Sequence, residues 1–190
     1  MSDTGRKWSR RVVFRLPLAL LAVTTVAGCS SGELPIVGET ETGANTQPAA
    51  PVVGRLAPEF TLVRLNGEPL MLSDLHGRPV VVNFFATWCG PCKAEMPEFQ
   101  AAQKRHGDGE NLAVLFIDWQ ESATVVRSFV EDLGIPEESV LLDDSGDVGR
   151  LYRVRGMPTT FFIDRDGVIQ AAHLGAIDRS LLDRGLAKIP

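Results

Sequence analysis

The stretch that decides the fold is VVVNFFATWCGPCKAEMPEF, residues Val80–Phe99. It begins with the dense apolar run Val80–Phe85, which is typical of a central strand buried on both faces. After a short connection, Cys92, Met96 and Phe99 recur at the spacing of one helix face. A buried strand that leads through a pair of cysteines into an amphipathic helix predicts an α/β domain with reactive sulfur at the start of that helix.

The sequence on either side continues the alternation of strands and helices. The turn Asp164–Gly167 predicts that the last two strands form a hairpin. The order β-β-α-β-α-β-α-β-β-α predicts one domain, residues 54–190, with a central mixed, mostly parallel sheet flanked by helices and an N-terminal β extension. The other strands are expected at Phe60–Leu65, Leu112–Ile117, Val140–Leu142, Thr159–Ile163 and Val168–His173, and the other helices after Ser122, at Asp147–Tyr152 and around Leu182–Ile189.

Residues 1–28 are expected to be an export signal and not part of the fold. A basic segment precedes the apolar stretch Leu16–Ala27, whose twelve residues are fewer than the about 20 that a helix needs to cross a bilayer. Val26–Cys29 resembles a bacterial lipobox, so Cys29 is expected to carry lipid and to become the new N-terminus. An ordinary signal peptide with a chance cysteine is the alternative.

Residues 29–53 are rich in Gly, Thr, Pro, Ala and Glu and show no hydrophobic period, which predicts a flexible tether. A strand arm packed on the domain is the alternative. Without residues 1–28, the chain keeps 14 basic and 23 acidic residues, a net charge of −9. This charge argues against binding to nucleic acid or anionic lipid. If the protein sits at a membrane, acylation alone must hold it there. We also expect a monomer in the bacterial cell envelope, on the extracytoplasmic side of the membrane.

Cys89 and Cys92 are close enough to form a local redox pair or half of a metal site. Zinc needs two further ligands, and His76, His106 and His173 lack ligand spacing. A helix N-terminus stabilises a thiolate through its unpaired N–H groups and its dipole. We therefore predict that Cys89 attacks, that Cys92 resolves the mixed disulfide one turn later, and that no metal or cofactor beyond this redox-active disulfide is needed.

Val80–Phe99, together with Gly156–Asp164 (GMPTTFFID), resembles the TlpA/ResA-type branch of the thioredoxin superfamily. The members of this branch are membrane-tethered extracytoplasmic disulfide reductases, several of which serve cytochrome c maturation. The resemblance covers about residues 57–189 and implies the thioredoxin fold. It also implies exported proteins with dithiols or disulfides as substrates, apocytochrome c among them, and a membrane thiol carrier as electron donor.

The resemblance further implies a cis peptide bond before Pro158, which would present the backbone of Met157 to an extended substrate strand. A trans proline that starts an edge strand is the alternative. Trp88 is expected to pack beside the cysteines and to shape the substrate contact. Trp119 either lines the same groove or covers the sheet, and the sequence leaves both readings open.

Cytosolic thioredoxins carry a buried aspartate six residues before the first cysteine, where this chain has Asn83, which cannot titrate. The tethered branch carries a glutamate on the helix instead, and Glu95 matches it. Because Glu95 lies one turn after Cys92 on the same face, it is predicted to be the general acid/base for Cys92. A solvated surface glutamate is the alternative.

Two other functions compete with the reductase. Peroxiredoxins carry Pro and Thr/Ser seven and three residues before their reactive cysteine, where this chain has Val82 and Ala86, so a peroxiredoxin-like thiol peroxidase is the weaker reading. A redox-silent module that binds peptides is a further alternative, against which the intact cysteine pair argues. The dipeptide Gly90-Pro91 between the cysteines is that of thioredoxin and favours a reductant.

Overall fold

The computed structural model describes residues 49–106 and 111–190. The expected signal segment, Cys29 and most of the expected tether lie outside these residues. The described strands are β1 (Thr61–Arg64), β2 (Pro69–Met71), β3 (Val80–Phe85), β4 (Ala113–Trp119), β5 (Val140–Asp143), β6 (Thr159–Ile163) and β7 (Ile169–Leu174). The helices are α1 (Gly90–Arg105), α2 (Ala123–Leu133), α3 (Asp147–Leu151) and α4 (Arg179–Leu186), with short 3₁₀ turns at Leu72–Leu75 and Glu137–Ser139.

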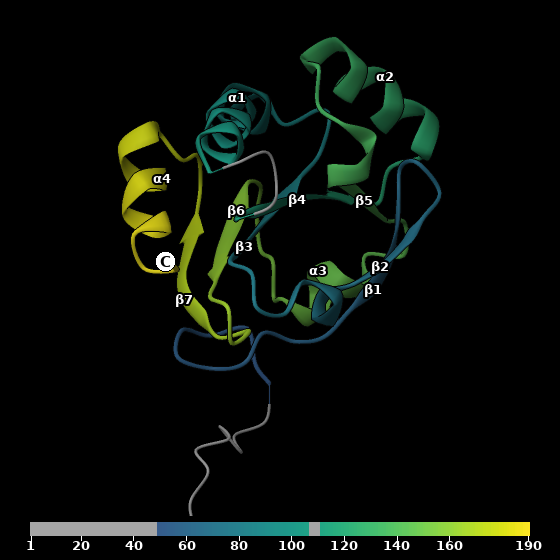
Figure 1. Cartoon of the computed structure of the whole chain (residues 1–190). Helices are drawn as coiled ribbons and strands as arrows, with labels where there is room; N and C mark the ends of the chain where they lie inside the picture. Colours follow the sequence, from purple (N-terminus) through teal and green to yellow (C-terminus); the bar gives the residue numbers. More distant parts are fainter. Residues whose placement is uncertain (1–48, 107–110) are drawn as a thin grey trace, which may run out of the picture. The chain divides into compact units, whose positions relative to one another are not determined.

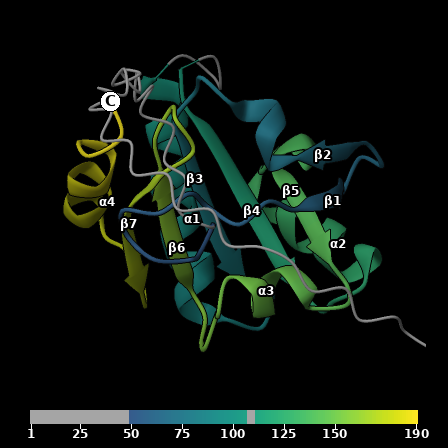
Figure 2. The same cartoon turned by 90° about the horizontal axis from the view of Figure 1, so that it is seen from below.

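The strands form one sheet in the order β2-β1-β5-β4-β3-β6-β7. Helices α1, α2 and α4 lie on one face of this sheet and α3 on the other (Figure 1). Seen from below, α3 crosses in front of the strands, while α1 lies behind them (Figure 2). The domain therefore has three layers, as the predicted α/β class requires.

The sheet is mixed, as predicted, and its parallel part is limited to β3, β4 and β5. The pairs β1–β2, β1–β5, β3–β6 and β6–β7 are antiparallel. Only α1 and α2 act as crossovers between neighbouring parallel strands. After α3 the chain returns on the far side of β3 in the opposite direction, so the parallel share is smaller than the alternation of strands and helices led us to expect.

Strand β2 was not anticipated from the sequence. It follows a turn at Asn66-Gly67 and pairs with β1 in antiparallel register. With three residues that begin at Pro69, β2 is too short for a period of two to be recognised. It occupies the edge of the sheet, where a proline costs no ladder hydrogen bond.

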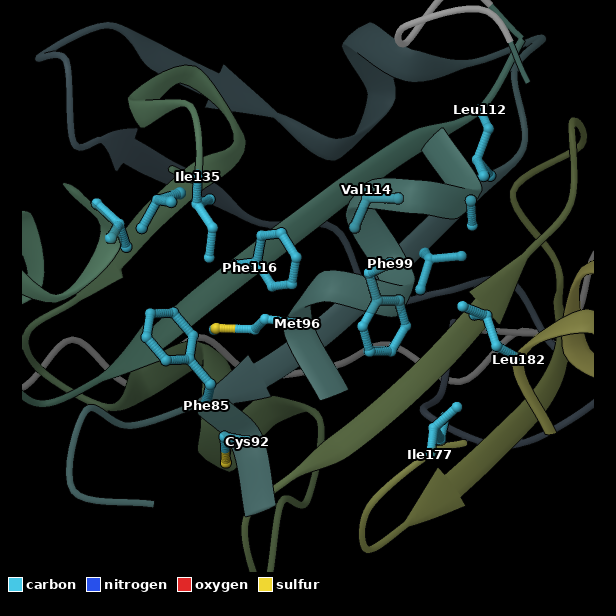
Figure 3. Packing of buried hydrophobic residues seen from close by; sticks show 14 of the residues in the cluster. Phe85, Cys92, Met96, Phe99, Leu112, Val114, Phe116, Ile135, Ile177 and Leu182 are labelled. Atoms are coloured by element: carbon cyan, nitrogen blue, oxygen red, sulfur yellow. The ribbon is translucent and has the colours of Figure 1, made fainter. Parts of the chain in front are cut away.

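Side chains of β3 alternate between two hydrophobic layers. Val81 and Phe85 belong to the layer beneath α1, whereas Val82 and Phe84 belong to the layer on the α3 side. Figure 3 shows the α1 layer, in which Phe85, Met96 and Phe116 gather and Cys92 lies at the end of the cluster. The same alternation thus builds the core and brings the second cysteine to its edge.

The layer on the α3 side is an aromatic cluster of Phe60, Phe84, Tyr152 and Phe161. Its rings lie 5.1–6.1 Å apart between centroids, the usual range for edge-to-face pairs. The Tyr152 hydroxyl donates a hydrogen bond to the carbonyl of Pro58 at 2.7 Å, so its one polar atom is satisfied. This layer stabilises the sheet from the side opposite the cysteines.

Candidate active site

Cys89 and Cys92 form a disulfide at the start of α1. Cys89 is the N-cap of the helix, and its Sγ accepts a hydrogen bond from the N–H of Cys92 at 3.2 Å. Pro91 lies in the first turn, where its missing N–H breaks no helical bond. The first turn carries no acidic side chain. The sulfur of Cys89 therefore faces amide donors and the positive end of the helix dipole, surroundings that favour a thiolate.

The two sulfurs differ in accessibility. Cys92 is completely buried, whereas 4% of Cys89 is exposed. An incoming thiolate therefore reaches Cys89 first. Trp88 is 73% exposed, so the residue before Cys89 presents a large apolar ring to solvent.

The peptide bond between Met157 and Pro158 is cis, as predicted. The next residue, Thr159, pairs with Phe84 near the end of β3, so the cis bond lies at the same end of the sheet as the connection to Cys89. Among the described residues, none makes a hydrogen bond with the backbone N–H or C=O of Met157. These two groups are available to a further strand.

Glu95 is buried, with 2% of its surface exposed, so the alternative of a solvated surface glutamate is wrong. Its Oε1 accepts a hydrogen bond from Asn83 Nδ2 at 2.8 Å, and its Oε2 accepts one from the N–H of Ile177 at 2.7 Å. Burial raises the pKa of Glu95 from 4.5 to about 7, against the lowering effect of these two bonds. A carboxyl group with such a pKa exchanges its proton near neutral pH.

Asn83 has a role that the sequence reasoning missed. Its Nδ2 also donates to Thr160 Oγ1 at 3.0 Å, so one amide joins β3, β6 and the glutamate of α1. The signal was present in the sequence, because Asn83 is a single polar residue in an apolar strand. Its place in the period of two puts it on the face of Val81 and Phe85, beneath α1.

Trp119 lies away from the cysteines. It packs against the layer on the α3 side, because it falls on the other face of β4 from Phe116. This packing supports the reading that Trp119 covers the sheet.

No group of three or more His, Cys, Asp or Glu side chains in the described ranges is placed to hold a metal ion. Within the same ranges, no helix has the length and apolar character to cross a membrane.

The AhpC/TSA family profile matches residues 53–172 of the chain. Thioredoxin-like protein YneN of Bacillus subtilis is 38% identical over 136 residues, which cover 70% of this chain and 78% of the relative. Thiol-disulfide oxidoreductase ResA of Oceanobacillus iheyensis is 38% identical over 138 residues, 69% of each chain. The crystal structure of the exposed lipoprotein thioredoxin Etrx1 of Streptococcus pneumoniae has a TM-score of 0.59 at 27% identity and covers 70% of this chain and 100% of that one.

The family match contains both cysteines, Glu95 and the cis-proline segment. At the two positions where peroxiredoxins need a proline and a hydroxyl group, the buried residues Val82 and Ala86 supply neither. The relatives named above are thioredoxin-like proteins or thiol-disulfide oxidoreductases. The chain therefore belongs to the AhpC/TSA family and, within it, is a thiol-disulfide oxidoreductase of the TlpA/ResA type with the thioredoxin fold.

Proposed function

We propose that the protein is a membrane-tethered, extracytoplasmic reductase of disulfides in exported proteins. The observation that carries this proposal is the Cys89–Cys92 disulfide at the start of α1, one turn before the buried Glu95. A reductase needs an accessible sulfur that forms a thiolate, a second sulfur within one helical turn and a group that moves a proton near neutral pH. In our proposal Cys89, Cys92 and Glu95 fill these three roles in that order.

In the proposed reaction, the Cys89 thiolate attacks one sulfur of a substrate disulfide and the other substrate sulfur leaves as a thiolate. Cys92 then attacks Cys89 Sγ, which breaks the mixed disulfide, releases the second substrate thiolate and forms the Cys89–Cys92 bond. Two electrons pass from the dithiol to the substrate. Glu95 accepts the proton that Cys92 loses. A groove lined by Glu95, Glu98 and Asp178, among others, gives this proton a route to solvent.

The substrate segment would lie in extended form against Met157. The free backbone groups of that residue can add a substrate strand next to Pro158, and the ring of Trp88 can pack on the apolar part of the same segment. Affinity from backbone bonds and one aromatic contact does not depend strongly on substrate sequence, which suits an enzyme that acts on several exported proteins.

Lipid on Cys29 would hold the enzyme at the membrane, and residues 29–53 would form its tether. The lipobox-like sequence supports this part, as does the lipoprotein nature of the pneumococcal relative. Electrons would come from a membrane thiol carrier, and apocytochrome c is one substrate with the required disulfide. We further propose that the enzyme acts as a monomer, that it uses no metal or other cofactor and that it does not bind nucleic acid.

Trapping tests these roles directly. In cells that make the Cys92→Ala variant, mixed disulfides between Cys89 and client proteins should accumulate, because nothing resolves them. The Cys89→Ala variant is the matched control and should trap none. Equal trapping by the two variants would contradict the assignment, and the identity of the trapped proteins decides whether apocytochrome c is a client. Peroxide consumption as fast as disulfide reduction would instead support the thiol peroxidase.

A further inference from the structure

The side chain of Glu121, in the connection between β4 and α2, holds the turn that leads into Cys89. The Cys89 N–H donates to the carbonyl of Ala86 at 3.0 Å, which closes a turn with Thr87 and Trp88 in its middle. Both donors of Thr87 bond to Glu121: the N–H to Oε2 and the hydroxyl to Oε1, each at 2.6 Å. The hydroxyl bond has a length typical of a carboxylate acceptor. Glu121 thus fixes the residue two positions before the nucleophile.

Asp118 lies beside this contact and is short of hydrogen-bond donors. It is completely buried and pairs with Phe85, the last residue of β3. Its Oδ2 accepts a hydrogen bond from the N–H of Glu121 at 3.0 Å, whereas no described group donates to its Oδ1. A buried carboxylate oxygen without a donor is costly. A proton on the Asp118 carboxyl removes this cost, because the resulting O–H can be donated to the Glu121 side chain, whose interaction with Asp118 raises the pKa of Asp118.

Asp143 shows how an ordinary structural aspartate is satisfied in the same protein. It ends the neighbouring strand β5 and is also buried, but its two oxygens accept the N–H groups of Val148 at 3.2 Å and Gly149 at 2.8 Å. Asp143 has a donor for each oxygen, and Asp118 has one donor for two. Of these two buried aspartates, only the one beside the Thr87 contact lacks a donor.

We propose that Asp118 and Glu121 hold one proton between them, and that this proton keeps Thr87 and the Cys89 turn in the position needed to attack a disulfide. Both acids are positioning residues and do not touch the substrate. The inference rests on the proposed chemistry of Cys89. When the shared proton is lost, two negative carboxylates are left in contact, and their repulsion draws Glu121 away from Thr87.

The charges and the burial around Asp118 place the loss of the shared proton above neutral pH. Burial raises the pKa of Asp118 to about 8, the contact with Glu121 and the charge of Asp144 act in the same direction, and the bond from the Glu121 N–H lowers it. The charges that act on Asp118 are those of Glu121 and Asp144, and both raise its pKa. The pair therefore keeps its proton at pH 7 and loses it as the pH rises through about 8.

The proposal is tested by the rate at which the reduced protein reduces the disulfides of insulin. This rate is measured between about pH 6 and about pH 10, on the full chain with Cys29→Ser in detergent. Asp118→Asn carries a permanent donor, so we expect its rate to stay within about twofold of the parent at pH 7 and to exceed it about tenfold at the alkaline end. Asp118→Leu, of similar size without a polar atom, should be slower at every pH. Asp143→Asn is the matched control and should follow the profile of the parent.

The amide proton of Thr87 gives a readout that needs no activity. Its NMR shift should titrate with a midpoint near that of the alkaline loss of rate and should stay constant over this range in Asp118→Asn. Superimposable rate profiles of the parent and Asp118→Asn, or a Thr87 shift that titrates only near pH 4, would overturn the proposal. An absence of insulin reduction at any pH would contradict the proposed function, and the Thr87 titration would still decide whether the proton is shared.

Discussion

The two faces of the central sheet bury different kinds of residue. The face under α3 carries the aromatic cluster of Phe60, Phe84, Tyr152 and Phe161. The face under α1 has an apolar layer of similar extent, but buried polar side chains interrupt it near the cysteines. Asn83, Glu95, Asp118 and Thr160 are each at most 2% exposed.

The difference indicates which face stabilises the fold and which carries the chemistry. On the α3 side the rings of Phe60, Phe84, Tyr152 and Phe161 have ring neighbours, and the hydroxyl of Tyr152 has a partner. The buried Asp143 on this side has a donor for each carboxylate oxygen, and the exception is Trp119 Nε1, which has no partner among the described residues. On the α1 side Asn83 Oδ1 and Asp118 Oδ1 have no donor from the described residues, and burial raises the pKa of both Glu95 and Asp118. Buried titratable groups cost stability, so they are expected where reactivity needs them. The predictions below test this division.

The cysteines give the largest expected effect. Cys89→Ser should reduce insulin reduction by about a thousandfold or more, because an alcohol cannot replace the thiolate nucleophile. Its free energy of unfolding should stay close to that of the reduced parent, since the substitution exchanges one atom. Chemical denaturation followed by circular dichroism measures the second quantity. A residual rate near that of the parent would show that the chemistry lies elsewhere.

Phe84→Ala probes the opposite face and should be the largest effect on stability. Phe84 is completely buried and contacts the rings of Tyr152 and Phe161, so its loss should lower the free energy of unfolding by about 3–5 kcal/mol. The activity of the remaining folded protein should change little. Val125→Ala, at an exposed position, is the control and should stay within about 0.5 kcal/mol of the parent. A large loss of rate at unchanged folded fraction would contradict the division of roles between the faces.

Glu95→Gln tests the cost of a titratable group on the active face. The folded state binds the Glu95 proton more tightly than the unfolded state, because its pKa rises from 4.5 to about 7. The resulting stability is complete below the unfolded pKa and is lost as the pH rises through about 7. Between about pH 5 and about pH 8, the free energy of unfolding of Glu95→Gln should fall by about 1–3 kcal/mol less than that of the parent. Urea titrations at each pH measure this difference.

The control for this substitution lies on the same helix. Glu98→Gln removes a half-buried carboxylate one turn further along α1. Its free energy of unfolding should change with pH as that of the parent does. The slope that remains in Glu95→Gln belongs in part to Asp118, whose raised pKa acts in an overlapping range. If the free energy of unfolding of Glu95→Gln and of the parent changed equally with pH, Glu95 would not be the group that accepts a proton near neutral pH, as the mechanism requires. In Glu95→Gln, the reactivity of Cys92 should also lose its dependence on pH near 7.

The sequence predicted the elements that depend on a long local pattern. The bounds of β3 and β6 agree with the predicted runs, because each is a continuous apolar segment between clear breaks. The left-handed Gly134 ends α2 as its place after Leu133 predicted. Strand β2 escaped prediction because three residues contain too little pattern.

The site was predictable where a motif fixes it and not where the tertiary fold brings residues together. The cysteine pair followed from its spacing before a helix, and the cis bond before Pro158 followed from the family resemblance. The bond between Glu95 and Ile177 joins residues 82 positions apart, and the contact of Thr87 with Glu121 joins residues 34 apart. Neither pairing produces a periodic pattern in the sequence, so the three-dimensional fold is needed to find them.

Trp88→Ala should have the smallest effect on stability and would sharpen the comparison most. Because Trp88 is 73% exposed, its removal should change the free energy of unfolding by less than about 0.5 kcal/mol. The KM for insulin should nevertheless rise, with kcat nearly constant, since the ring contributes binding surface that is the same in the ground state and the transition state. Val63→Ala, at an exposed position of β1, is the matched control and should alter neither constant. A fall in kcat at constant KM would instead place Trp88 among the groups that position Cys89, together with Thr87, and would extend the active face from buried polar residues to its exposed rim.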